Sequence, residues 1–324
     1  MQKALVILGP TASGKTSLAL MLSRKIRCEI ISLDSALVYR DMDIGTAKPT
    51  KEELALVPHH LINIKDPKES YSAADFRKDC IEKVSEILSR GNLPIICGGT
   101  MMYYKALVEG LSPVPQTLPE IRKQVLDLAT KIGWNAIHEK LRNFDEKSYL
   151  KLNPNDKQRV SRAYEVYLQT NRSISSFYEE QKGDKCPFMR EEFILLPKDE
   201  DRKDLRAIIA ERFKLMLDAG LISEVKKLYQ RGDLNLNMPS MRAVGYRQVW
   251  EYLDGLYDYD TMIEKAIFAT SHLAKHQMTW LRGALAQSSQ HKTRLLIGDK
   301  DNLSKVMNVI EPFLENYFLL MICK

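Results

Sequence analysis

The stretch GPTASGKT at residues 9–16 is the part of the sequence that indicates the fold most directly. It matches the pattern G-x-x-x-x-G-K-[ST], in which a glycine-rich turn cradles phosphate groups. The apolar run Ala4–Leu8 precedes it, as expected of a buried parallel strand, and Ser17–Leu22 has the character of a helix start. Backbone N–H groups of such a turn point into one concavity, and the helix N-terminus adds partial positive charge. The sequence therefore predicts a diphosphate or triphosphate site formed by Gly9, Pro10, Thr11, Ala12, Ser13, Gly14, Lys15 and Thr16.

Two side chains of this motif carry its chemistry. The Lys15 ammonium can reach phosphate oxygens, and the Thr16 hydroxyl suits a Mg²⁺ ion bound to the same oxygens. We therefore expect Mg²⁺ as the cofactor, with Thr16 as its protein ligand. A chance glycine turn is the alternative, which the flanking strand and helix patterns disfavour. The motif predicts what binds and leaves open which bond is broken.

Composition places the chain among ordinary globular proteins. It has 324 residues, of which 44% are hydrophobic and 28% charged, with a net charge of +6. This mild basicity fits a solvated surface as well as a nucleic-acid partner. The five cysteines include no C-x-x-C pair, which disfavours disulfides and a cysteine zinc site and indicates a reducing cytoplasm. No signal peptide is evident, and the apolar run Phe318–Ile322 is far shorter than the ~20 residues of a membrane span.

The first third of the chain alternates between strand and helix patterns. After Ala4–Leu8, candidate strands are Glu29–Asp34, His60–Ile64 and Leu93–Cys97, and Ser72 caps a helix that runs to Arg90. Such alternation predicts an α/β fold with a parallel sheet flanked by helices, as in P-loop NTPases. Ligands of these sheets bind at the carboxyl ends of the strands. The glycine-rich turn, Asp34 and the segment 98–100 should therefore meet at one site.

A proline-rich segment marks a change of architecture. Three prolines within Leu111–Pro119 indicate a linker, and the patterns that follow are helical until a strand returns at Glu192–Pro197. We expect an all-helical domain over residues 115–190, inserted into a core domain formed by residues 1–114 and 191–324. In the core, helices are expected over 202–219, 222–231, 241–253 and 259–285, followed by a strand at 293–297 and a final helix.

Asp34 and three basic segments are the further candidate functional groups. A carboxylate at the end of the second strand could accept a proton or bind Mg²⁺, or it could simply cap the following loop. The basic segments are Lys157–Arg162, Met238–Trp250 and Ser271–Arg294, and the last two contain no acidic residue. Basic groups interleaved with aromatic ones suit phosphate contacts and base stacking, although a solvated helix face is the alternative for each segment. Together they favour an anionic polymer as partner.

Two other patterns have a more ordinary interpretation. His272 and His276 have the spacing of a zinc helix, but they lack both the glutamate of H-E-x-x-H and an evident third ligand. Met101, Met102 and Met216 are expected to pack in the core.

Eight strings of the chain together resemble the bacterial tRNA dimethylallyltransferases, also called tRNA isopentenyltransferases. The likeness covers nearly the whole chain in order, and its most specific string is DIGTAKP at residues 43–49. The strings are GPTASGKT (9–16), DS (34–35), YRDMDIGTAKP (39–49), HHLI (59–62), GGT (98–100), QRVSR (158–162), MRAVGYRQ (241–248) and QMTWLR (277–282).

The resemblance implies transfer of a dimethylallyl group from dimethylallyl diphosphate to N6 of the adenosine just 3′ of the anticodon, in tRNAs reading codons that begin with U. The glycine-rich turn would hold the isoprenoid diphosphate rather than ATP. Asp34 would accept the amine proton, and Lys15, Thr16, Thr100 and Arg212 would complete the catalytic set. The helical domain would grip the anticodon stem-loop, and we expect a cytoplasmic monomer that contacts no membrane.

The resemblance also implies a set of tRNA contacts. Two residues depart from the usual pattern, because Leu37 replaces a frequent glutamine and His276 replaces a frequent arginine. The implied contacts are Asp34, Ser35, Ala36, Leu37, Thr100, Arg122, Gln158, Arg159, Val160, Ser161, Arg162, Arg242, Gly245, Tyr246, Arg247, Lys275, His276, Gln277 and Trp280.

Two rival functions stay open on the sequence alone. Small-molecule kinases with a P-loop also carry an acid at the end of the second strand, and an RNA-binding or switch NTPase is the third class. Neither an N-K-x-D guanine signature nor a separate Walker-B aspartate is evident. Transfer of label from dimethylallyl diphosphate or from ATP would distinguish these functions.

Overall fold

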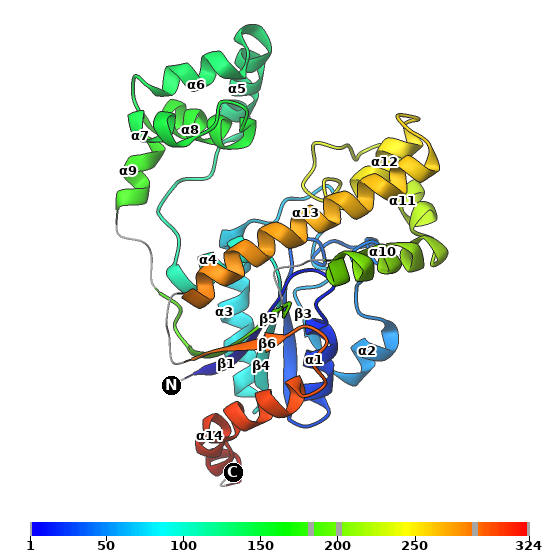
Figure 1. Cartoon of the computed structure of the whole chain (residues 1–324). Helices are drawn as coiled ribbons and strands as arrows, with labels where there is room; N and C mark the ends of the chain where they lie inside the picture. Colours follow the sequence, from blue (N-terminus) through cyan, green and yellow to red (C-terminus); the bar gives the residue numbers. More distant parts are fainter. Residues whose placement is uncertain (1, 181–184, 199–202, 287–290, 323–324) are drawn as a thin grey trace. The chain divides into compact units, whose positions relative to one another are not determined.

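The computed structural model describes residues 2–180, 185–198, 203–286 and 291–322. The chain divides into two compact units, which Figure 1 shows with their helices and strands. The larger unit comprises Met1–Leu107 and Pro187–Lys324, and the helical unit comprises Val108–Cys186. The helical unit thus begins before residue 115 and ends before residue 190, the bounds expected from the sequence.

The larger unit is built on a six-stranded sheet in the order β3-β2-β4-β1-β5-β6. Every pairing in the sheet is parallel, as expected when helices connect successive strands. This confirms the predicted α/β fold with a parallel sheet flanked by helices. The strands are β1 (Lys3–Leu8), β2 (Cys28–Leu33), β3 (His59–His60), β4 (Leu93–Gly98), β5 (Met189–Leu196) and β6 (Lys292–Leu296).

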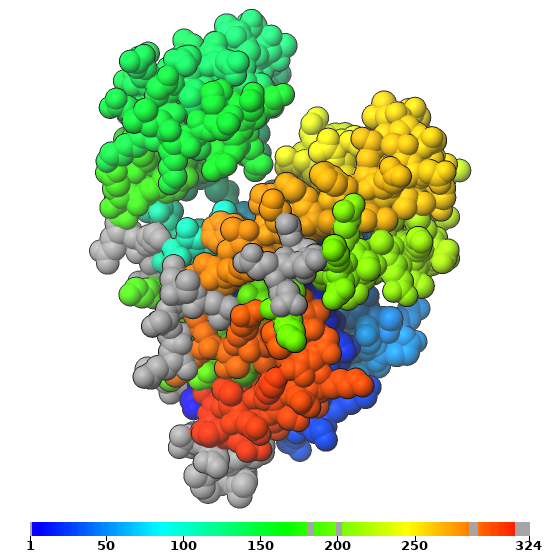
Figure 2. All heavy atoms as spheres, viewed as in Figure 1, coloured from blue at the N-terminus to red at the C-terminus, as the bar shows by residue number. Residues whose placement is uncertain are grey.

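Helices of the larger unit flank this sheet and extend beyond it (Figure 1). The longest, α13, reaches the visible surface along much of its length (Figure 2). The helices are α1 (Lys15–Ser23), α2 (Lys51–Leu56), α3 (Ala73–Ser89), α4 (Met101–Glu109), α10 (Lys203–Asp218), α11 (Leu221–Gln230), α12 (Tyr246–Leu253), α13 (Tyr259–Ala286) and α14 (Asn302–Ile322).

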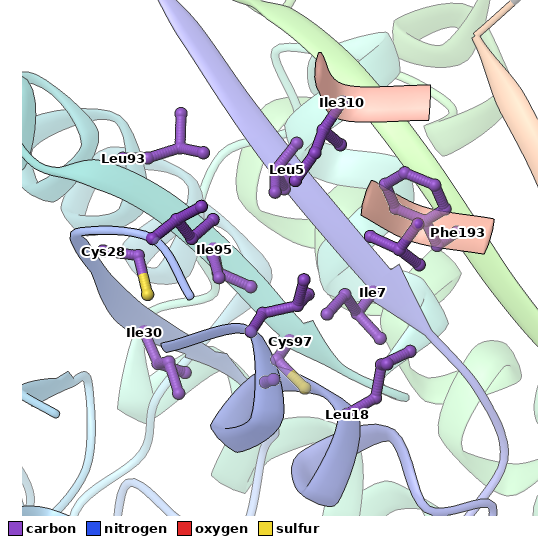
Figure 3. Close-up of a cluster of buried hydrophobic side chains, with 14 of the residues drawn as sticks. Leu5, Ile7, Leu18, Cys28, Ile30, Leu93, Ile95, Cys97, Phe193 and Ile310 are labelled. Atoms are coloured by element: carbon purple, nitrogen blue, oxygen red, sulfur yellow. The ribbon is translucent and has the colours of Figure 1, made fainter. Parts of the chain in front are cut away.

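One apolar core of the larger unit lies between the sheet and two helices, α1 and α14. Leu5 and Ile7 of β1 pack there with Leu18 of α1, Phe193 of β5 and Ile310 of α14 (Figure 3). Alternate residues of β1 face the other side of the sheet and are buried as well, so the strand is apolar from Ala4 to Leu8. Central strands covered on both faces form the rigid base from which the loops at their carboxyl ends project.

Two sequence-based predictions about the larger unit were wrong in detail. The third strand is only His59–His60, because Leu61 and Asn63 adopt positive φ angles of 60° and 55° and so leave the extended conformation. Helix α12 begins at Tyr246 rather than at residue 241, because Gly245 has φ 88°. The first residue of the helix predicted over 202–219 lies outside the described residues.

Helix α2 was missed, although its capping box was readable in the sequence. The Thr50 side chain accepts a hydrogen bond from Glu53 N at 3.2 Å, and Glu53 Oε2 accepts one from Thr50 N at 2.8 Å. These reciprocal bonds satisfy N–H groups that no helical carbonyl can reach.

The helical unit contains helices only, within its described residues. Val125, Ile137, Val160 and Phe177 contribute to an apolar core that belongs to this unit alone. The helices are α5 (Pro119–Ile132), α6 (Trp134–Leu141), α7 (Glu146–Lys151), α8 (Lys157–Thr170) and α9 (Ile174–Glu179). In neither unit does a described helix combine the length and the apolar character needed to cross a membrane.

Candidate active site

A cavity of about 560 Å³ opens in the larger unit where the carboxyl ends of β1, β2 and β4 meet α10 and α13. This is the edge of a parallel sheet at which ligands are expected to bind. Fifteen of the residues singled out from the sequence line it together. They are Thr11, Ala12, Lys15, Thr16, Asp34, Ser35, Ala36, Leu37, Thr100, Arg212, Arg242, Gly245, His276, Gln277 and Trp280.

The glycine-rich turn has the geometry of an anion site. Gly14 is the N-cap of α1 with φ 82°, and no side chain caps the first N–H groups of the helix. Ser13 is buried beneath the turn, and its Oγ would lie 2.4 Å from a Cβ at position 9, so a glycine is required there. Gly9, Ser13 and Gly14 therefore shape the turn. The motif residues that line the cavity are Thr11, Ala12, Lys15 and Thr16.

Lys15 is folded back onto its own turn. Its Nζ donates a hydrogen bond to the Pro10 carbonyl at 3.1 Å. Burial lowers the pKa of Lys15, Cys97 and Asp34 oppose that shift, and Arg212 adds to it. A phosphate oxygen is a stronger partner for an ammonium than a carbonyl is, and a dianion nearby would favour the charged form. The lysine is thus placed to bind an anionic ligand in the cavity.

Asp34 both caps its loop and faces the cavity. Its Oδ1 accepts hydrogen bonds from Ala36 N at 2.8 Å and from Leu37 N at 3.4 Å, so the loop-capping interpretation is correct. Oδ2 has no hydrogen-bond partner among the described residues, and the residue lines the cavity. The loop bonds hold the carboxylate in place and leave one oxygen available to a proton donor.

Arg212 and Thr100 complete the polar end of the cavity. Burial lowers the pKa of Arg212, and the carboxylate of Asp34 opposes this shift, so the two side chains are close enough to interact electrostatically. Thr100 Oγ1 accepts a hydrogen bond from Ser35 N at 3.0 Å. This bond ties the loop after β4 to the loop after β2. The cavity therefore presents two cations, from α1 and α10, and a carboxylate on a loop that is tied to the loop after β4.

Apolar side chains from α4, α10 and α13 form another wall of the cavity. Met102 is 57% exposed, so the expectation that it packs in the core was wrong. No sequence signal identified this wall, because its members come from helices far apart in the chain and each has ordinary helical spacing. The wall consists of Met101, Met102, Ile209, Phe213, Met216 and Leu273. A cationic end beside an apolar wall suits an anion that carries a short hydrocarbon chain.

One predicted RNA contact in the larger unit is corrected by burial. Tyr246 is fully buried, and its hydroxyl donates a hydrogen bond to Glu224 Oε1 at 2.5 Å. Its ring closes the space under Gly45, where a Cβ would lie 2.5 Å from the ring. Tyr246 is therefore a structural residue.

Two further predicted RNA contacts lie outside the active-site cavity. Arg247 is exposed and pairs with Glu251 at 2.7 Å. Lys275 lies on the far side of α13 from Gln277 and lines a different cavity.

Glu224 explains the segment DIGTAKP. Its carboxylate accepts hydrogen bonds from Asp43 N at 2.9 Å, Ile44 N at 2.8 Å and Gly45 N at 3.2 Å. These bonds fix the segment against α11, and its residues Gly45, Thr46 and Ala47 line the cavity. The most specific string of the sequence is thus a segment that Glu224 holds in place and that forms part of one wall of the site.

The predicted RNA contacts of the helical unit divide into exposed and buried residues. Gln158 and Arg159 are exposed, and Arg122 is exposed with its Nε 3.8 Å from Glu165. Val160 is fully buried, and Ser161 is buried and donates to Glu165 at 2.8 Å, which corrects the prediction that their side chains contact RNA. Arg162 is half-buried and donates to the Pro115 carbonyl at 2.6 Å.

The oxygen donors at the cavity fit the expected metal, Mg²⁺. The exposed Thr16 hydroxyl and the Asp34 carboxylate line the cavity that holds Lys15, and both offer the hard oxygen atoms that Mg²⁺ prefers. Within the described residues no group of three or more His, Cys, Asp or Glu could hold a metal, so the interpretation of His272 and His276 as a zinc site has no third ligand. A small number of protein ligands is normal for Mg²⁺, because this ion binds chiefly to substrate phosphates and water.

Comparisons with known proteins identify the family to which the chain is similar. The family model of IPP transferases matches residues 37–284. Among solved structures, the chain is similar to a tRNA isopentenylpyrophosphate transferase from Bacillus halodurans, with 34% identity over 99% of both chains and a TM-score of 0.68. A tRNA Δ(2)-isopentenylpyrophosphate transferase from Staphylococcus epidermidis is 32% identical over 98% of this chain and 99% of its own, with a TM-score of 0.66.

A more distant similarity extends to eukaryotes. A eukaryotic dimethylallyltransferase described as acting on tRNA is 25% identical over 98% of this chain and 80% of its own, with a TM-score of 0.81.

Proposed function

Because this chain belongs to the IPP transferase family, we propose that it transfers the dimethylallyl group of dimethylallyl diphosphate to N6 of the adenosine immediately 3′ of the anticodon in tRNA. The observation that carries the proposal is one cavity that joins Lys15, Arg212 and Asp34 to an apolar wall. A kinase would also need cations and a carboxylate at its phosphate site, but the family match and the similar solved structures favour the transferase.

The leaving group is the main catalytic problem of this reaction. As the bond from the allylic carbon to diphosphate oxygen breaks, negative charge grows on the diphosphate, and groups that stabilise this charge lower the barrier. The N–H groups of the glycine-rich turn, the Lys15 ammonium and the Arg212 guanidinium would do this. A bound Mg²⁺, held on the protein by Thr16, would supply further neutralisation of that charge. The apolar wall would hold the dimethylallyl chain and exclude water.

Asp34 would act as the general base. As N6 of the adenine forms its bond to the allylic carbon, the amine must lose a proton, and Oδ2 of Asp34 would accept it. The two hydrogen bonds to Oδ1 fix the orientation of the carboxylate without using this second oxygen. Atoms balance, since the dimethylallyl group moves to N6, the proton to Asp34 and the electron pair of the broken bond to diphosphate.

The tRNA would present the adenine to the cavity out of its stack. Arg242, His276 and Trp280 line the cavity and are exposed, so they would contact the nucleotides around the reacting base. Gln158, Arg159 and Arg122 of the helical unit are exposed as well and would contact the stem-loop. The monomeric state, the cytoplasmic location and the preference for codons that begin with U stay predictions.

A labelling experiment tests the proposal. The protein is incubated with Mg²⁺ and unmodified tRNA, together with either dimethylallyl diphosphate labelled in its carbon chain or ATP labelled in its γ-phosphate. We expect label in tRNA from the isoprenoid alone. Phosphorylation of any added acceptor would favour the kinase, and binding of tRNA without transfer would favour an RNA-binding protein.

A further inference from the structure

Four ring-bearing side chains recur at every fourth residue of α13. They are Phe268, His272, His276 and Trp280, and all four are exposed. Phe268 has 66% of its surface exposed and Trp280 has 44%. Residues four apart on a helix are neighbours, so the rings form a continuous stripe, which we call the ring track.

Three rings of the track contact their neighbours, and the fourth, that of Trp280, lies under the Lys105 ammonium, which is 5.5 Å from its centroid. The centroids of Phe268 and His272 are 6.4 Å apart with planes inclined by 15°, and those of His272 and His276 are 4.3 Å apart. The residues that bury α13 lie on a different face, at Ala266, Ala274 and Met278. Exposed rings that gather on one face of a helix can form a binding surface.

The ring track connects two cavities. His276 and Trp280 line the active-site cavity, whereas Phe268 and His272 line a second cavity of about 440 Å³ between α10 and α13. Ile209 of α10 lines both, so the cavities adjoin. A ligand that follows the track would pass from the second cavity to the reacting group without leaving the surface of α13.

The second cavity is positively charged. Lys203, Arg206 and Lys275 line it, and none of the described residues that line it carries a carboxylate. Arg206 and Lys275 have no ion-pair partner in the described part of the chain. The Ser271 hydroxyl borders the same cavity and is buried without a hydrogen-bond partner there. These groups complement a phosphate backbone.

The charge also marks where the track ends. Beyond Phe268, an adjoining hollow is lined by Glu251 and Glu264 as well as by basic groups. An anionic strand is therefore favoured only from Phe268 towards the active site.

We propose that the ring track binds unpaired nucleotides of the tRNA loop next to the reacting adenosine, with their bases stacked on Phe268 and His272 and their phosphates near Arg206 and Lys275. The inference rests on the proposed function and adds to it a second subsite for RNA. Bases stack on aromatic rings regardless of sequence, while cations contact the backbone. Stacking of the neighbours would also compensate for the stacking that the extruded adenine loses.

The test uses the full-length protein and a stem-loop RNA with the anticodon arm of a substrate tRNA. Phe268→Ala and Phe268→Leu should each weaken stem-loop binding by about 5- to 150-fold, the effect of losing one stacked base. Phe268→Trp should retain parental affinity, because it keeps an aromatic face. Leu256→Ala is the matched control, since Leu256 is 67% exposed and lines neither cavity, and it should bind as the parent does. The KM for dimethylallyl diphosphate should not change in any variant.

Two outcomes would overturn the inference. Equal stem-loop affinities for the parent and Phe268→Ala would mean a solvated face, and parental affinity in Phe268→Leu would mean an apolar contact without stacking. In each case the parent would still transfer the dimethylallyl group, so the proposed function would stand. A parent that binds no stem-loop would contradict both proposals.

Discussion

The side-chain amide of Gln277 joins α13 to the glycine-rich turn: its Oε1 accepts a hydrogen bond from Thr11 N at 2.9 Å. Its Nε2 donates to the Gly99 carbonyl at 2.9 Å. The amide therefore connects the loop after β1 to the loop after β4, and it approaches so closely that a Cβ at position 99 would lie 2.7 Å from Nε2. Gln277 was expected to contact tRNA, but these bonds make it a positioning residue for the phosphate site.

Replacing Gln277 should affect the diphosphate more than the RNA. Gln277→Ala removes both bonds and should raise the KM for dimethylallyl diphosphate by about 5- to 100-fold, from the cost of two unmade hydrogen bonds. Gln277→Glu should be worse, because it loses the donor to Gly99 and adds a negative charge near the diphosphate. Steady-state kinetics and tRNA dissociation constants would measure the two effects separately. Thr279→Ala, an exposed neighbour on α13, is the control. A change in tRNA affinity alone would restore the direct-contact interpretation.

Lys15→Ala should slow the chemical step. Loss of one group that stabilises developing negative charge costs about 10²–10³ in rate at comparable sites. Single-turnover transfer with saturating substrates would measure this, with Lys25→Ala as the control because Lys25 is exposed near the other end of α1. An unchanged single-turnover rate would exclude Lys15 from leaving-group stabilisation.

Asp34→Asn should separate the two roles of Asp34. The asparagine keeps an oxygen that can accept the bonds from Ala36 N and Leu37 N, so the loop should stay in place. The lost base should slow transfer by roughly 10²–10⁴. Equilibrium tRNA binding should be nearly parental. Collapse of tRNA binding with normal chemistry on the bound tRNA would instead make Asp34 a contact residue.

Gly45→Ala should destabilise the protein through a steric clash. The new Cβ would lie 2.5 Å from the Tyr246 ring and 2.8 Å from Leu221, both of which are fully buried, so overpacking should cost about 1–3 kcal/mol. Gly283→Ala is the matched control, because nothing lies within 4 Å of its Cβ and alanine favours a helix. The free energy of unfolding in urea would be compared for the two variants. Equal free energies of unfolding would show that the segment bound by Glu224 can shift to accommodate the new methyl group.

His276→Arg should strengthen RNA binding. His276 lines the active-site cavity and is exposed, and a guanidinium is always charged and makes more phosphate contacts than a neutral imidazole does. The variant should bind tRNA more tightly near neutral pH, and the magnitude of the slope of log affinity against log salt should rise by somewhat less than one unit. Lys275→Ala should lower that slope. Superimposable salt series would indicate that this part of α13 faces solvent.

The sequence predicted the parts of the site that lie close together in the chain. A strand, a glycine-rich turn and a helix follow one another within residues 3–23, so local patterns were sufficient for Lys15 and Thr16. The parallel sheet followed from the alternation of elements, and with it the convergence of Asp34 and Thr100 on one edge.

The rest depended on contacts between distant residues. Gln277 and Thr11 are 266 residues apart, and no local pattern indicates that an amide on a helix will bind a turn. No local pattern indicates that Glu224 binds the segment 43–45 either, or that the apolar wall assembles from α4, α10 and α13. Burial was the other limit: Val160 and Tyr246 lie in strings typical of RNA contacts, but both side chains face a core.

The most direct test of the central claim is the chemical identity of the product. After a single turnover with Mg²⁺, dimethylallyl diphosphate and an unmodified substrate tRNA, the tRNA is digested and its nucleosides are analysed by mass spectrometry. We predict one new nucleoside, adenosine carrying a dimethylallyl group on N6, derived from the position just 3′ of the anticodon, with release of an equal amount of diphosphate. Unchanged nucleosides, or a modification at another base or atom, would contradict the account.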